Sequence, residues 1–182
     1  KSFSIAKTGM GEGTEVGLLD TDMAWIDMGY LIAYAIGQFV WGITADKVGP
    51  RKVLLGGMLI SILTGVAMGV STLPLAMGVF FFIQGLCQST GWAPLTKNVS
   101  NFFSQRERGT IMGMWCTNYA VGGVVASALA AWAATQWGYQ YAFFVPAGVL
   151  LCIWFLVVFC QRNRPEDVGL PPIEEYHDEQ KE

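Results

Sequence analysis

The chain has 182 residues, of which 53% are hydrophobic and 14% are charged, and its formal net charge is −3. Because a soluble domain carries about 25% charged residues and a nucleic-acid-binding domain carries a basic patch, the composition favours a membrane protein and excludes a nucleic acid as partner. The single histidine and the four cysteines form no ligand cluster in the sequence, so we expect neither a metal site nor another cofactor.

Charged residues are absent from three long stretches, residues 28–45, 53–96 and 109–161. A helix needs roughly 20 apolar residues to cross a bilayer, so the first stretch accommodates one crossing and each of the others accommodates two. Membrane β-strands would alternate apolar and polar residues, and stretches such as VLLGGMLISILTGVAMGV do not. The sequence therefore predicts an all-α, polytopic membrane bundle with five complete spans, at residues 23–43, 53–71, 74–97, 109–134 and 139–160.

Basic residues are confined to alternate breaks between these spans. They are Lys47, Arg51 and Lys52 at the first break, Lys97, Arg106 and Arg108 at the third, and Arg162 and Arg164 after the last span. The positive-inside rule places these breaks in the cytoplasm, together with the polar residues 161–182, which we interpret as a linker. Five spans with a cytoplasmic C-terminus put Lys1 outside, so we expect one further span before Lys1 and a bundle of six helices within a longer chain.

Polar and aromatic side chains follow one face of three predicted spans. They are Tyr30, Tyr34 and Gln38 on the first, Gln84, Gln88 and Trp92 on the third, and Asn118 and Tyr119 in the middle of the fourth. Such groups are costly in lipid, so they either hydrogen-bond between helices or line a shared polar cavity, and three stripes together favour the cavity. The predicted substrate-binding residues are Tyr34, Gln38, Gln88, Trp92 and Tyr119, with Lys1 near the outer part of the cavity.

The stretch GITADKVGPRK joins the first two spans and carries charges that the helix ends do not explain. Asp46 lies at the C-terminal end of one helix, and Arg51 and Lys52 lie at the start of the next. An acid at a helix C-terminus and bases at an N-terminus are both unfavourable for the helix dipole. We therefore expect these charges to have partners on other helices.

The same stretch resembles the signature of the major facilitator superfamily, Gly-x-x-x-Asp-(Arg/Lys)-x-Gly-x-Arg-(Lys/Arg). The matching residues are Gly42, Asp46, Lys47, Gly49, Arg51 and Lys52. The resemblance implies a cytoplasmic loop whose charges bond across helices and steady one conformation. The conformational latch predicted in this way consists of Asp46, Arg51 and Lys52 at the first break and Arg106, Glu107 and Arg108 at the third.

A narrower resemblance is to the organophosphate:phosphate antiporters, which exchange glycerol phosphate or hexose phosphates. It is carried by GWAPLTKNVSNFFSQRERGT and by RPEDVGLPPIEEY in the tail. The fifth-helix signature of that group is matched by Arg108, Gly109, Trp115, Gly122 and Gly123 but not by Cys116, Tyr119 and Ala120, and Gln38 stands where several members have lysine. Lys1 resembles the lysine at the end of the first helix of that group.

The resemblance implies the N-terminal half of a major facilitator carrier, without its first helix, in the plasma or inner membrane. The expected substrate is a small organic anion such as a sugar phosphate or glycerol phosphate, moved by alternating access, with exchange for phosphate as one mode. The expected partners are this anion, membrane lipid and the C-terminal half, and we expect no enzymatic activity. A membrane receptor for sugar phosphates on the same fold is the alternative.

Overall fold

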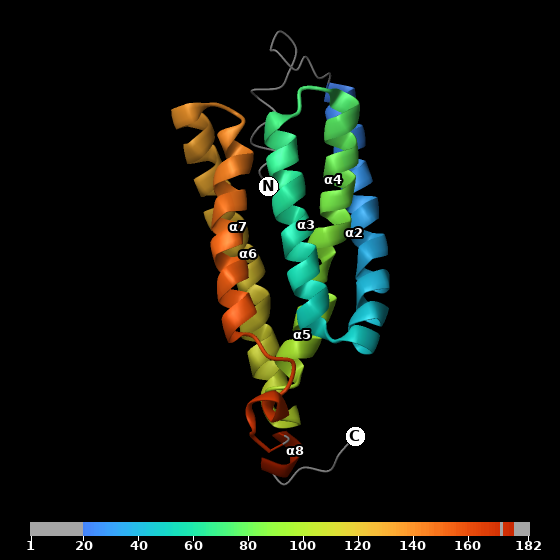
Figure 1. Cartoon of the computed structure of the whole chain (residues 1–182), viewed down its shortest axis with the longest axis vertical. Coiled ribbons are helices and arrows are strands. Elements are labelled where there is room, and N and C mark those ends of the chain that lie inside the picture. The colour runs from blue at the N-terminus through green and yellow to red at the C-terminus, as the bar shows by residue number, and fades with distance from the viewer. Residues whose placement is uncertain (1–19, 172, 177–182) are drawn as a thin grey trace.

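The computed structural model describes residues 20–171 and 173–176, and every regular element in this part of the chain is a helix. Lys1 lies outside the described residues. The helices are α2 (Asp20–Val48), α3 (Pro50–Val70), α4 (Pro74–Gln88), η2 (Ser89–Gly91), α5 (Ala93–Ser100), α6 (Gln105–Trp137), α7 (Tyr141–Cys160), η3 (Pro165–Val168) and α8 (Ile173–Tyr176). The long helices run side by side along the vertical axis of Figure 1. The breaks that carry basic residues all lie at the lower end of that view, as the charge count predicts.

Local chemistry sets the ends of the helices. Pro50 and Pro74 occupy the first helical positions of α3 and α4, where a missing backbone N–H costs nothing. Ser104 precedes α6 and is bonded to Glu107, whose carboxylate accepts from the Ser104 backbone N–H at 3.3 Å and from its hydroxyl at 3.0 Å, as in a capping box. Gly49 turns the chain between α2 and α3 with a φ of 91°, a value that favours glycine.

The third span differs from the continuous helix predicted over residues 74–97. It consists of α4, the 3₁₀ turn η2 and α5, which ends at Ser100. The hydroxyls of Ser89 and Thr90 donate to the carbonyls of Leu86 at 2.6 Å and Cys87 at 2.7 Å, and Pro94 has no N–H for the carbonyl four residues earlier. Side-chain bonds to the backbone and a proline therefore interrupt the helix at this point.

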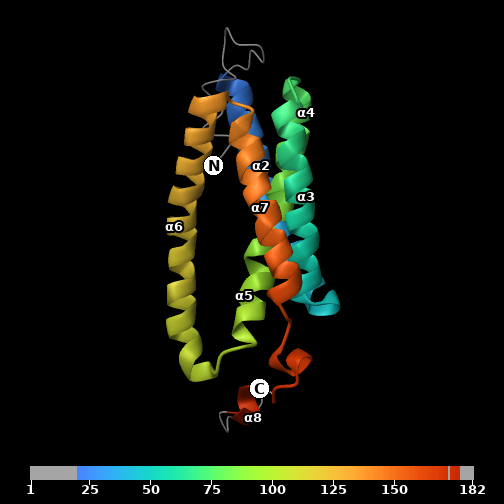
Figure 2. The ribbon, with the colours of Figure 1, turned by 60° about the vertical axis from the view of Figure 1, so that its left-hand side comes forward.

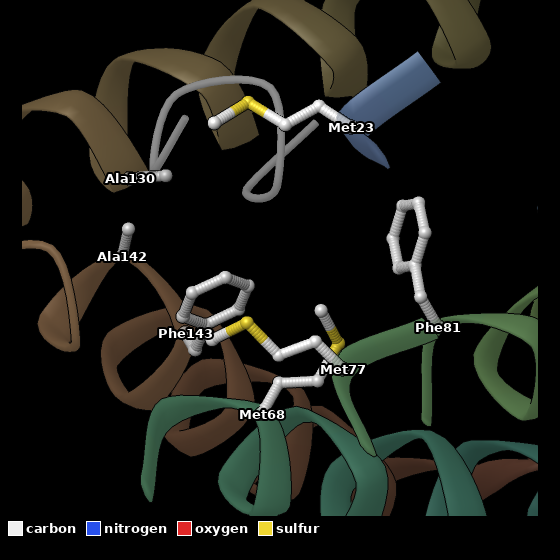
Figure 3. Packing of buried hydrophobic residues seen from close by; sticks show 7 residues of the cluster. All are labelled: Met23, Met68, Met77, Phe81, Ala130, Ala142 and Phe143. Carbon is white, nitrogen blue, oxygen red and sulfur yellow. The ribbon is translucent and has the colours of Figure 1, made fainter. Parts of the chain in front are cut away.

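The helices pack as two groups that are joined along the contact between α3 and α7. The first group consists of α2, α3 and α4, and the second consists of α6 and α7 (Figure 2). Helix α6 packs mainly against α7, and α7 also packs against α3, which joins the two groups. Buried side chains from all five long helices meet near the end of the bundle opposite the basic breaks (Figure 3). They are Met23, Met68, Met77, Phe81, Ala130, Ala142 and Phe143.

Among the described residues, four helices are long and apolar enough to cross a membrane by length and composition, namely Thr21–Val48, Pro50–Val70, Arg106–Trp137 and Tyr141–Cys160. The 15-residue α4 reaches the same end of the bundle only with η2 and α5. Large apolar side chains such as Phe39, Val124 and Phe159 are exposed on the outer faces. Because these faces carry apolar rather than charged side chains, they suit contact with lipid.

Candidate functional site: a polar cavity between three helices

A cavity of about 480 Å³ lies between α2, the junction of α4 with α5, and α6. Its polar and aromatic lining residues are Tyr30, Tyr34, Gln88, Trp92, Asn118 and Tyr119. Leu31 and three glycines, two of them on α6, complete the wall. The three polar stripes that the sequence placed on separate helices therefore meet around one space.

The α2 side of the cavity is built around Tyr30. Its hydroxyl donates to Oε1 of Gln88 on α4 at 3.1 Å. Its ring stacks on Phe81 with the ring centroids 4.5 Å apart and lies 6.1 Å from the Tyr34 ring. Phe81 belongs to the buried core, so packing in the core fixes the position of the Tyr30 ring. The Tyr30 hydroxyl then fixes the position of the Gln88 amide.

The α6 side of the cavity approaches the junction of α4 and α5 through two aromatic rings. The ring of Trp92 meets that of Tyr119 edge to face, with centroids 6.1 Å apart and an interplanar angle of 79°. Both side chains are exposed, as is Asn118 beside Tyr119. This pair is a preferred aromatic geometry and leaves ring faces open to the cavity.

Four of the six predicted substrate-binding residues line this cavity: Tyr34, Gln88, Trp92 and Tyr119. Gln38 lies one turn further along α2 than Tyr34 and is not among the lining residues. Lys1 belongs to the part of the chain that is not described.

Two cavity residues were outside the predicted site although their stripes were visible in the sequence. They are Tyr30, one turn before Tyr34, and Asn118, next to Tyr119.

Every lining residue of the cavity within residues 20–171 and 173–176 is uncharged. The same part of the chain contains no group of three histidine, cysteine or acidic side chains arranged to hold a metal ion. The described wall therefore offers hydrogen-bond donors, acceptors and aromatic faces to a ligand. An anionic group needs cations or several oriented donors to offset its desolvation, and this wall contains no cation.

Two charges of the predicted latch, those of Asp46 and Arg51, have partners on other helices. Asp46 at the end of α2 forms an ion pair with Lys97 on α5. Arg51 at the start of α3 donates from Nη2 to the Val158 carbonyl of α7 at 2.5 Å. Lys97 was predicted only as a topology signal, so its ion pair with Asp46 was not foreseen.

The remaining latch residues lie near the start of α3 and of α6. Lys52 and Arg106 are exposed, Glu107 accepts the two hydrogen bonds from Ser104, and Arg108 donates from Nε to the Phe103 carbonyl at 3.2 Å. The contacts of Glu107 with Ser104 and of Arg108 with Phe103 stabilise the turn between α5 and α6.

A second cluster at the end of the bundle that carries the basic breaks was absent from the sequence prediction and is centred on Asn98 of α5. This buried side chain donates from Nδ2 to the carbonyls of Arg162 at 2.8 Å and Asn163 at 3.2 Å. Its Oδ1 accepts from Nε2 of Gln161 at 3.0 Å. Oδ1 of Asn163 in turn accepts from the Arg51 backbone N–H at 2.9 Å. The start of the polar tail is thus bonded to both α3 and α5.

These features define a class of protein: a multi-pass helical membrane protein with a polar cavity between its helices. Comparison with protein families gives the family. The model of the Major Facilitator Superfamily matches residues 3–179. The chain belongs to the major facilitator superfamily and is an integral, multi-pass membrane protein.

The chain is also similar to curated relatives with transport names. It is 31% identical to the glycerol-3-phosphate transporter of Bacillus subtilis (strain 168) over 170 residues, covering 91% of this chain and 38% of the relative. A probable hexose phosphate transport protein of Chlamydia trachomatis is 29% identical over 181 residues, covering 99% and 39%. Sugar phosphate exchanger 3 of Bos taurus is 34% identical over 165 residues, covering 87% and 32%. The chain thus spans between 32% and 39% of these relatives.

Proposed function

We propose that this chain is part of a secondary transporter that moves a phosphorylated metabolite, such as a sugar phosphate or glycerol phosphate, by alternating access. The observation that carries the proposal is the cavity in which polar stripes of α2, α4 and α6 face one another. Binding sites between helices near the middle of the membrane are typical of secondary transporters. The names of the relatives supply the substrate class, with exchange for phosphate as one mode.

The transporter reading is preferred to a sugar-phosphate receptor because the relatives described above are named as transporters and exchangers. The same names give no support to an enzymatic activity. We propose the plasma or inner membrane as the location. The proposed partners are the anionic substrate, membrane lipid and a C-terminal half that completes the cavity.

The proposed substrate-binding residues are Tyr34, Gln88, Trp92 and Tyr119, which share the cavity. Gln38, one turn beyond Tyr34 on α2, is kept as a proposed substrate-binding residue. Lys1 is kept as the one cation of the proposed set. The proposed latch is Asp46, Arg51, Lys52, Arg106, Glu107 and Arg108, to which we add Lys97.

Uptake tests the proposal directly. The full-length protein is reconstituted into vesicles loaded with inorganic phosphate, and entry of labelled glycerol 3-phosphate and glucose 6-phosphate is followed. We expect saturable entry that depends on internal phosphate if exchange operates. Saturable binding without entry would instead support the receptor, and no response to any phosphate ester would refute the proposed substrate class.

Asp46→Asn should lower the transport rate with little loss of folded protein. The Asp46 and Lys97 side chains are 62% and 45% exposed, and an exposed ion pair contributes about 0–1 kcal/mol to stability. A latch acts instead on the balance between conformations, so Lys97→Gln should lower the transport rate by a similar factor. The double variant should transport no more slowly than either single variant, because both changes break the same ion pair. The measurement is the initial rate of uptake, normalised to folded protein.

Glu166→Gln is the matched control for this charge change, because Glu166 is an exposed acid in the tail at the same end of the molecule. It should transport at the wild-type rate. Wild-type rates in Asp46→Asn and Lys97→Gln would show that the ion pair is no part of a latch.

A further inference from the structure

The uncharged lining of the cavity limits which chemical groups of a ligand it can bind. Its polar groups are two amides, three phenols and the indole N–H of Trp92, and the exposed rings of Trp92 and Tyr119 add flat surfaces. Amides and phenols can both donate and accept hydrogen bonds. Uncharged groups of this kind cannot neutralise a phosphate, whose transfer from water needs cations or charge-assisted bonds.

Resting on the proposed transport of phosphate esters, we propose that this wall binds the uncharged, hydroxyl-bearing part of the substrate, a sugar or polyol, and not its anionic group. Sugar hydroxyls are donors and acceptors at once and match amide side chains. The C–H face of a sugar or polyol matches an exposed aromatic face, because aromatic side chains present an apolar body beside their polar edge. The cations for the phosphate then come from residues outside this wall.

Gln88 is the main hydroxyl-binding group of the wall, and Tyr30 positions it. The Tyr30 hydroxyl donates to Oε1 of Gln88 at 3.1 Å, which leaves the Gln88 NH₂ group to donate into the cavity. Stacking on Phe81 with centroids 4.5 Å apart fixes the ring of Tyr30. Asn118 faces the same cavity from α6, so a hydroxyl-bearing ligand can bond to both sides of the cavity.

A pair of phosphate esters separates this role from phosphate binding. Glycerol 3-phosphate and propyl phosphate carry the same phosphate and the same three carbons, but propyl phosphate lacks both hydroxyls. A site built to hydrogen-bond the hydroxyls of a ligand discriminates against a ligand that lacks them. The full-length protein is purified, and the affinities of both esters and of inorganic phosphate are measured for the wild type, Gln88→Leu, Asn118→Leu and Tyr30→Phe.

We expect the wild type to prefer glycerol 3-phosphate over propyl phosphate. Gln88→Leu should reduce that preference about three- to tenfold, corresponding to one or two hydrogen bonds, and Asn118→Leu should act in the same direction. The affinity for inorganic phosphate should change less than twofold. Tyr30→Phe keeps the stacked ring and frees the Gln88 amide, so it should reduce the preference by a smaller factor. Tyr139→Phe, at a partly buried tyrosine outside the cavity, should match the wild type.

If Gln88→Leu and Asn118→Leu lose affinity equally for inorganic phosphate and for both esters, the inference is overturned, because the wall would then bind the anionic group. An unchanged preference in Gln88→Leu and Asn118→Leu would overturn it as well. If the wild type binds no phosphate ester, the proposed function fails. Saturation-transfer NMR then measures binding of glucose and glycerol to the wild type and to Gln88→Leu, and this tests the hydroxyl-binding wall without any phosphate. A saturation-transfer signal from glucose or glycerol that is weaker in Gln88→Leu than in the wild type supports the hydroxyl-binding wall. No such signal in the wild type refutes it.

Discussion

Gly85→Ala should destabilise the contact between α2 and α4 by about 1–3 kcal/mol, the usual cost of overpacking. A Cβ atom at Gly85 would lie 2.5 Å from the Tyr30 backbone oxygen and 3.2 Å from Cβ of Ala33. A backbone oxygen cannot rotate away as a flexible side chain can, so the two helices must separate. Because Tyr30 also bonds to Gln88, the same change should disturb the cavity and lower substrate affinity.

Gly56→Ala is the matched control for this substitution. Gly56 lies in α3, and a Cβ atom there meets nothing within 4 Å. Alanine is favoured over glycine in a helix interior by about 1 kcal/mol, so this variant should be as stable as the wild type or more so. Thermal unfolding of the two variants in detergent gives the comparison. Equal stability of Gly85→Ala and Gly56→Ala would show that α2 and α4 are not in such close contact.

Asn98→Asp should detach the start of the tail from the bundle. The carboxylate has nearly the same shape as the amide but cannot donate to the carbonyls of Arg162 and Asn163, which now receive 2.8 and 3.2 Å bonds. Asn98 is only 5% exposed, so the carboxylate would be a buried charge facing two carbonyl oxygens. The expected cost is about 1–3 kcal/mol for each buried group left without a partner.

Loss of this contact is measured by thermal unfolding and by proteolysis after Arg162 and Arg164, which should become faster. The control is Ser100→Ala, two residues along α5, because the Ser100 hydroxyl bonds only locally, to the Lys97 carbonyl at 2.8 Å. Wild-type unfolding and cleavage in Asn98→Asp would contradict a tail held by Asn98.

The sequence was most informative where one pattern decides the structure. Long uncharged stretches predicted the helical membrane fold, because a chain in lipid must satisfy its backbone within helices or a closed barrel. Polar side chains at every fourth residue predicted the polar faces of the first and third spans, and the neighbours Asn118 and Tyr119 predicted that of α6. Four of the residues proposed from these patterns line one cavity.

Features that depend on pairs of distant residues were not predictable in this way. Charge counting predicted that Asp46 and Lys97 lie on the same side of the membrane, but it did not predict the ion pair between them. The bonds of Asn98 to the carbonyls of Arg162 and Asn163 involve backbone groups, which every residue has, so no sequence pattern marks them. The break after α4 depends on Ser89 donating to a nearby carbonyl, a local bond that competes with the helix where the hydropathy is continuous.

Cysteine accessibility at Gly122 tests the central claim, a substrate cavity with alternating access, most directly. Gly122 lines the cavity, and a Cβ atom there meets nothing within 4 Å, so Gly122→Cys adds a probe without displacing a proposed binding residue. Gly148→Cys on α7 is the control, since its Cβ is equally free but Gly148 is not among the cavity residues. Both are made in a background whose native cysteines are replaced by alanine.

A membrane-impermeant thiol reagent is applied from either side of sealed vesicles, with and without glucose 6-phosphate or glycerol 3-phosphate. We expect Gly122→Cys to react from both sides, one of the esters to slow this reaction, and Gly148→Cys to react from neither side. Reaction of Gly122→Cys from one side only, or at a rate that neither ester changes, would contradict this expectation.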